Sequence, residues 1–213
     1  MFQDENIRYF DEPGPQNTDH VLEVVTKYVT EKKPKHLIIA STSGKTALKF
    51  AEALNGRVEI ICISEPPSRQ LWGDIWPTLD SKIKSKLKEL NVTVVDHIPY
   101  SFHNSVLEHA RWYFPVAEHI VGDTLAMVGG QGLKVAVQVI FMAAEVGLIK
   151  EGEEVLAVAG YGGGADTAIV AKAGFPEMTF SADVERRLEV REILAMPKKK
   201  KWWKWDERSC LKR

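Results

Sequence analysis

The stretch from His36 to Ala53 reads HLIIASTSGKTALKFAEA, and it decides the fold that we expect for this chain. Its first part, Leu37 to Ile39, is a short apolar run, which suits a strand buried on both faces. Small and hydroxyl-bearing residues follow from Ser41 to Thr46. Apolar residues then recur at helical spacing up to Asn55-Gly56, a pair that ends helices because both residues tolerate a positive φ. The stretch therefore predicts a buried strand, a tight turn and a helix.

The turn of this unit is a candidate anion site. The first N–H groups of a helix have no intrahelical partner, and the helix dipole is positive there. Hydroxyl groups and a cation add donors, so we expect a phosphate group to bind to Ser41, Thr42, Ser43, Gly44, Lys45 and Thr46. The alternative interpretation is a helix start that Ser or Thr caps without any ligand. A nucleotide-hydrolysing phosphate loop is excluded, because its first Gly would stand at Ile39, inside the strand.

Composition places the chain among globular proteins of the cell interior. With 213 residues, 45% of them hydrophobic, it fits a single domain over residues 1–197, followed by a basic, Trp-rich tail over 198–213. The formal net charge of -1 gives no general attraction to nucleic acid or membrane. Two cysteines form no disulfide framework, and the N-terminus has no signal-peptide pattern. We therefore expect a cytoplasmic protein with no nucleic-acid partner and no membrane partner.

Further apolar runs predict more strands of one sheet. These runs are Val58–Ile63, Val92–Val95 and Val155–Ala159. Strands that alternate with helices favour a mostly parallel sheet covered on both faces, whose ligands lie beyond the carboxyl ends of the strands. The turns Ser64-Glu65 and Asp96-His97 fall at that edge, so we expect them to share a crevice with the turn at Ser41–Thr46.

A second glycine-rich turn, Gly129–Gly132, precedes a long apolar helix over Leu133–Val146. This turn is either a second anion site, helped by Lys134, or a tight turn packed against the sheet. A helix that is apolar almost all round lies at the centre of a domain or at a subunit interface, which leaves room for a homodimer. Acid–His neighbours such as Glu108-His109 and Glu118-His119 lack the spacing of a helical zinc site, so we predict no metal.

The segment Gly160–Ala165 allows two interpretations. It matches the G-x-G-x-x-A pattern of a dinucleotide-binding loop, with Asp183 in the place of the ribose-binding acid. It is equally consistent with a hairpin loop, because Ala168–Ala171 has the composition of a returning strand. A charged helix over Val184–Ala195 is expected to end the domain. The tail after it is expected to dock on its own domain or on a partner subunit.

Four ordered motifs together resemble a known family. They are Tyr9-Phe10 with Pro13-Gly14 and Asn17-Thr18, Ala40–Ala47, Gln131–Val135 with Met142–Ala144 and Gly147, and Gly164–Ala168. The chain is thereby similar to the stand-alone proteins related to the C-terminal domain of pyruvate kinase. Gln138, Glu145 and Gly163 depart from the family pattern, which usually has Glu, Asp and Arg at these places.

The resemblance implies a three-layer α/β/α sandwich with a mostly parallel, five-stranded sheet whose last strand is antiparallel. It also implies a bound phosphorylated small molecule, with flavin mononucleotide as the leading cofactor. Besides the turn at Ser41–Thr46, the residues expected to line the site are Asn17, Thr18, Gly132, Lys134, Gly162, Gly163, Asp166 and Thr167. Pyruvate kinase activity is not expected, because its catalytic barrel has no counterpart here. A regulatory sensor and a flavin-dependent oxidoreductase both remain open, and no catalytic residue is assigned.

Overall fold

One seven-stranded sheet forms the centre of the protein. The computed structural model describes residues 6–102 and 116–201. The strands are β1 (Arg8–Phe10), β2 (His36–Ala40), β3 (Glu59–Ile63), β4 (Thr93–Val95), β5 (Glu154–Ala159), β6 (Thr167–Lys172) and β7 (Glu189–Pro197). The α-helices of the described residues are α1 (Thr18–Lys32), α2 (Lys45–Leu54), α3 (Ser81–Glu89) and α4 (Ala117–Glu145). The expected strand, turn and helix of residues 36–55 are confirmed as β2 and α2.

The strand order is β1-β7-β6-β5-β2-β3-β4, and every neighbouring pair is parallel except those that include β6. The predicted α/β fold with a mostly parallel sheet is confirmed. The expected number of five strands is wrong, because β1 and β7 extend the sheet beyond the antiparallel strand. The antiparallel strand is therefore the sixth along the chain and not the last.

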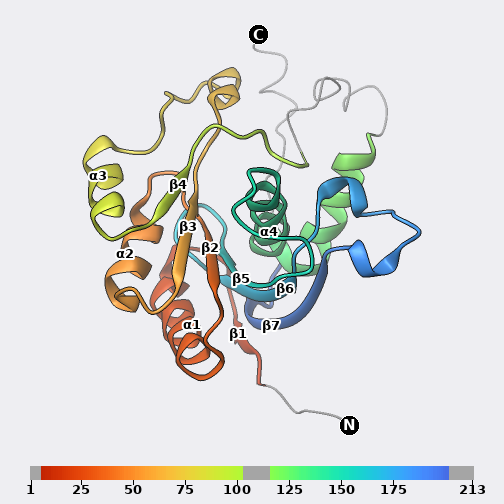
Figure 1. Cartoon of the computed structure of the whole chain (residues 1–213), viewed down its shortest axis with the longest axis horizontal. Helices are drawn as coiled ribbons and strands as arrows, with labels where there is room; N and C mark the ends of the chain where they lie inside the picture. The colour runs from red at the N-terminus through yellow and green to blue at the C-terminus, as the bar shows by residue number, and fades with distance from the viewer. Residues whose placement is uncertain (1–5, 103–115, 202–213) are drawn as a thin grey trace.

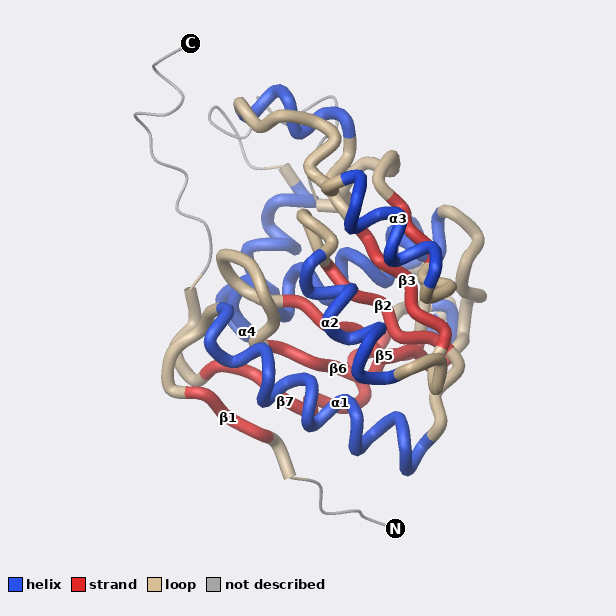
Figure 2. The backbone as a smooth tube through the Cα atoms, turned by 90° about the vertical axis from the view of Figure 1, so that its left-hand side faces the viewer, coloured by secondary structure: helices blue, strands red, loops and turns tan. Residues whose placement is uncertain are grey.

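Helices cover both faces of the sheet, which gives the three layers (Figures 1 and 2). In Figure 2, α1 and α2 lie in front of the sheet and α4 lies behind it. Leu37 and Ile39 of β2 pack in the core with α1, α2 and α3, while Ile38 packs in the core with α4. Because successive side chains of a strand point to opposite faces, a run that is apolar throughout must be covered on both.

The long helix α4 consists of two helical halves that meet at Gly130, whose φ is 78° and whose ψ is -178°. The second half begins after this break, as predicted for the apolar helix that follows the glycine-rich turn. By length and hydropathy, α4 is the one helix of the described residues that reaches the threshold for a membrane span, but 78% of that apolar window is buried inside the protein. This burial matches a core helix, because its apolar residues already pack on the sheet.

The prediction for the end of the domain is wrong. Residues 184–195 do not form a helix: Val184–Arg186 is a short 3-10 turn, and β7 follows. The strand pairs with β6 on one side and β1 on the other, so non-local hydrogen bonds outweigh the helical spacing of its apolar residues. The hairpin interpretation of Gly160–Asp166 is confirmed, because β6 returns antiparallel to β5.

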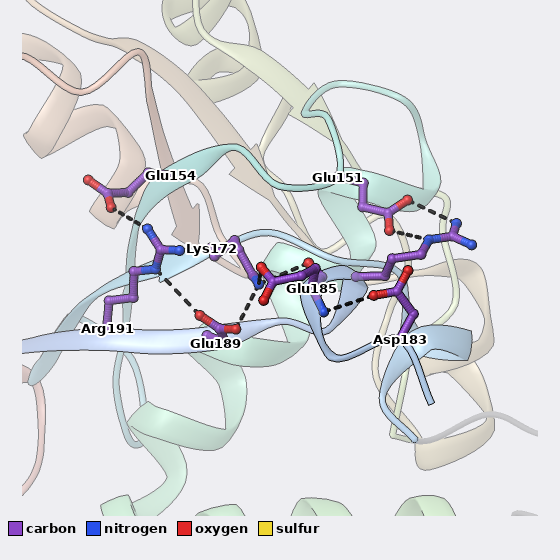
Figure 3. A network of polar contacts seen from close by, with 8 residues as sticks. Glu151, Glu154, Lys172, Asp183, Glu185, Glu189 and Arg191 are labelled. Atoms are coloured by element: carbon purple, nitrogen blue, oxygen red, sulfur yellow. Dashed lines mark hydrogen bonds and ion pairs between the residues drawn. The ribbon is translucent and has the colours of Figure 1, made fainter. Parts of the chain in front are cut away.

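The two ends of the strands carry different groups of residues. At the edge where β5 and β7 begin, ion pairs join the strands and their connections (Figure 3). Lys172 Nζ lies 2.7 Å from Glu189 Oε1, and Arg191 Nη1 lies 3.3 Å from Glu154 Oε2. The opposite edge holds the carboxyl ends of all strands except β6, together with the predicted phosphate-binding turn. Ligands of sheets of this kind bind beyond the carboxyl ends of the strands, so this end holds the candidate site.

Candidate functional site

The turn between β2 and α2 is held by backbone hydrogen bonds and by one hydrogen bond to a side chain. Ser41 N donates to Ile63 O of β3 at 2.9 Å, and Gly44 N donates to Ser41 O at 3.1 Å. The buried Ser41 hydroxyl accepts a hydrogen bond from Ala47 N at 3.3 Å. The N-cap residue of α2 is Gly44, so the expected Ser or Thr at the N-cap is wrong. The Ser41 hydroxyl is instead used inside the protein, by the N–H of Ala47.

Four backbone N–H groups of this turn have no hydrogen-bond partner among the described residues. They belong to Thr42, Ser43, Lys45 and Thr46. The hydroxyls of Ser43 and Thr46 also make no bond with described residues, and both side chains are half-buried. Lys45 is exposed and forms no ion pair with the described residues. These donors surround the positive end of the α2 dipole, which is the arrangement that binds an oxyanion.

The connection after β3 packs against this turn. Ser64 Oγ and Thr78 Oγ1 both donate to Thr42 O, at 2.8 Å and 3.2 Å. Trp76 Nε1 donates to Glu65 O at 3.1 Å, which fixes the half-buried indole beside the same turn. The prediction that Ser64-Glu65 lies beside the turn at Ser41–Thr46 is confirmed.

The third predicted turn, Asp96-His97, faces another element. Asp96 Oδ2 accepts from Lys84 Nζ of α3 at 2.6 Å, and its other oxygen lies 3.5 Å from His97 Nδ1. The Asp96 carboxylate is thus paired with Lys84, and no contact among the described residues links Asp96-His97 to Ser41–Thr46.

Glu65 places a carboxyl group next to the candidate anion site. Its Oε1 accepts from Thr42 Oγ1 at 2.7 Å, whereas its Oε2 is buried without a partner among the described residues. Burial raises the pKa of the Glu65 carboxyl above its ordinary value of 4.5, and the bond from Thr42 acts in the opposite direction. An ionised Glu65 would repel a bound anion, so its protonation state matters to the site.

Asp166 joins the N-terminal segment to the β5–β6 hairpin. Its fully buried carboxyl group accepts from Gly14 N at 2.9 Å, from Tyr161 N at 3.1 Å and from Thr167 Oγ1 at 2.8 Å. Burial raises the pKa of Asp166, and these three hydrogen bonds oppose the rise. Thr18 Oγ1 adds a link by accepting from Ala165 N at 3.0 Å.

The other predicted lining residues divide into two groups. The buried Asn17 donates to Glu12 O at 2.8 Å, and a Cβ at Gly132 would lie 2.0 Å from Thr167 Oγ1, so both residues are packed inside the protein. We call the buried residues that hold the loops at this end of the sheet, among them Asn17, Thr18, Asp166 and Thr167, the frame. Gly162 and Gly163 form the exposed tip of the hairpin, with φ of 70° and 104° and nothing within 4 Å of a built Cβ. Only this tip leaves room for a ligand beyond the frame.

The predicted second anion site is closed by the chain itself. Gln131 N, at the start of the second half of α4, donates to Lys201 O at 2.8 Å. Lys134 is buried and its Cε lies 3.0 Å from a Cβ built on Gly122, so it lies within the packed helix pair. A carbonyl oxygen thus occupies the position that an anion would take.

The basic residues that precede this carbonyl are paired as well. Lys199 Nζ and Lys201 Nζ lie 2.7 Å and 3.0 Å from the two oxygens of Glu12, and Lys198 Nζ lies 3.7 Å from Asp11 Oδ1. Sequence reasoning missed these pairs because the partners stand almost at opposite ends of the chain. The acidic pair Asp11-Glu12, directly before Pro13-Gly14, was the available signal.

No family model matches the chain.

Within residues 6–102 and 116–201, no group of three His, Cys, Asp or Glu side chains is placed to hold a metal ion. The tail after Lys201 and the neighbours Glu108-His109 lie outside the described residues.

Gly44→Ala should destabilise the protein more than Gly56→Ala. Both glycines have a positive φ, of 79° and 75°, so both substitutions cost about 1–2 kcal/mol of backbone strain. A Cβ at Gly44 would also lie 2.3 Å from Leu79 Cδ1, which adds about 1–3 kcal/mol of overpacking, whereas Gly56 has open space. Urea unfolding of the two variants measures the difference. Equal losses of stability would contradict the packing of Leu79 and of Ile83 of α3 against Gly44.

Glu65→Gln should change how stability depends on pH. A carboxyl pKa raised by folding means that the folded state binds more protons, so wild-type stability falls as pH rises from about 4.5 through the raised folded pKa. Gln keeps an acceptor for Thr42 but cannot ionise, so this fall should disappear in the variant. Chemical unfolding over a series of pH values tests this, with the exposed Glu52→Gln as the matched control. Parallel curves for wild type and Glu65→Gln would show that Glu65 is not the cause.

Proposed function

We propose that the turn between β2 and α2 binds the phosphate group of a small phosphorylated molecule. The observation that carries this proposal is the set of four N–H groups, from Thr42, Ser43, Lys45 and Thr46, that lack a partner among the described residues. An oxyanion accepts several such bonds at once and gains from the helix dipole and from the Lys45 charge. Water molecules satisfy exposed donors singly, and a phosphate would replace them.

Flavin mononucleotide is the leading candidate ligand. The donor set fits its phosphate group, and the half-buried Trp76 offers an aromatic face next to the same turn. The resemblance to stand-alone relatives of the pyruvate kinase C-terminal domain favours the same choice. In this proposal, Ser43 and Thr46 orient the phosphate through their hydroxyls, and the exposed Gly162-Gly163 tip lines the opposite wall.

The binding site supports a sensor or regulatory role. Lys45 and the free amides bind charge, but they form no nucleophile, base and orienting group in mutual contact. A bound flavin would supply electron-transfer chemistry of its own, and the chain would then contribute binding and orientation. This second function, a flavin-dependent oxidoreductase, requires that a reductant such as NADH can reduce the flavin while it is bound to the protein.

Lys45→Ala combined with Thr46→Ala should weaken the binding of flavin mononucleotide by about 1–3 kcal/mol, because charged hydrogen bonds to the phosphate are lost. Quenching of flavin fluorescence measures the affinity, and inorganic phosphate serves as a competitor. The matched control is Lys49→Ala, one turn further along α2, where the cation is already paired with Asp19. Unchanged affinity in the double variant would place the phosphate elsewhere.

The purified protein should be yellow, or become so when loaded with flavin mononucleotide, with a visible spectrum that differs from that of free flavin. Bleaching of this spectrum by NADH under anaerobic conditions would support the oxidoreductase. A flavin that stays oxidised, or a colourless protein stabilised against heat by sugar phosphates, would support the sensor. A protein that is stabilised by neither ligand would contradict the proposed function.

A further inference from the structure

One side of the first half of α4 exposes apolar side chains. Ile120, Met127 and Val128 are 54%, 61% and 56% exposed. They stand seven and eight residues apart, which is about two helical turns, so they form one stripe along the helix. We call these three residues the α4 stripe. Side chains of this size are normally covered when they gather on one surface.

The described part of the chain ends beside this stripe. Lys201 O accepts from Gln131 N at 2.8 Å, and a Cβ built on Gly130 would lie 3.6 Å from the same oxygen. Gly130 is only two residues from Val128. Lys199 and Lys201 itself hold the chain in this place through their ion pairs with Glu12. The described chain therefore ends, at Lys201, about one helical turn from the α4 stripe.

The twelve residues that follow Lys201 have the composition to cover it. Trp202, Trp203 and Trp205 stand among the first four, and each Trp can bury roughly 150–250 Å² of surface. Four extended residues span about 13 Å, whereas Met127 lies about 5 Å and Ile120 about 15 Å along the helix from Gly130. The first four residues of the tail thus reach most of the α4 stripe.

Charge favours the same pairing. Residues 202–213 contain four basic and two acidic residues. The first half of α4 carries the exposed acid Asp123, which stands three residues after Ile120 and four before Met127 and therefore borders the stripe. A segment tethered at this distance also has an effective concentration of about a millimolar, which a second copy of the chain would rarely match.

We propose that Trp202–Trp205 of the same chain docks on the α4 stripe. The contact fastens the carbonyl cap of Lys201 over Gln131 and thereby holds the break between the two halves of α4. The tail is then the last piece of the domain, and not a free basic arm that awaits a polyanion.

Disulfide trapping in the full chain tests this proposal. Val128→Cys and Trp203→Cys are combined with Cys210→Ser; the remaining Cys62 is fully buried. Mild oxidation should give an intramolecular disulfide at least about tenfold faster than in the control pair Glu52→Cys with Trp203→Cys, since α2 lies on the other face of the sheet. Val128 is 56% exposed, so its replacement leaves the core intact.

Three results would overturn the proposal. A disulfide-linked dimer would assign the α4 stripe to a second copy of the chain. Equal rates in the two pairs would mean that the tail has no preferred place. Failure to form the disulfide, together with sedimentation of the unmodified protein with phosphatidylserine vesicles, would assign the tail to a membrane surface instead.

Discussion

Backbone N–H groups at the carboxyl edge of the sheet need acceptors, and the way the chain supplies them organises this end of the molecule. Asp166 serves the amides of Gly14 and Tyr161, and Lys201 O serves the amide of Gln131. Buried donors without acceptors would cost about 1–3 kcal/mol each, so these bonds fix the loops firmly. The start of α2 differs, because four amides there have no acceptor among the described residues. The need of backbone N–H groups for acceptors thus explains the bonds of the frame and also identifies the start of α2 as the candidate site.

The frame and the site have separate residues. Thr18, Asp166 and Thr167 are buried and bonded within the protein, so their contribution is to hold the hairpin against the N-terminal segment. Ser41 likewise belongs to these internal contacts, since its buried hydroxyl accepts from the N–H of Ala47. Lys45 and the free amides remain for a ligand. Glu65 lies between the two groups: it is bonded to Thr42, yet its charge would act on any anion bound at the turn.

The sequence predicts the local parts of this structure well. β2, the turn and α2 follow from apolar spacing and from Asn55, which adopts the expected left-handed conformation. The hairpin at Gly160–Asp166 also follows from residues that are close in sequence. By contrast, β7 was predicted as a helix, because its pairing with β1 joins residues almost 190 positions apart. The hydrogen bond from Gln131 N to Lys201 O was missed for the same reason. Every residue has a carbonyl oxygen, so the residue type does not identify the acceptor, and Lys201 lies 70 positions away.

The central claim is that the amides of Thr42, Ser43, Lys45 and Thr46 converge on a bound phosphate. Two-dimensional NMR with backbone assignments, recorded during a titration with inorganic phosphate, tests it most directly. We expect these four amides to shift in a saturable manner, while the amide of Gln131 stays unchanged because Lys201 O already occupies its donor. Shifts at Gln131 without shifts at the α2 start, or no saturable shift at either place, would contradict the account.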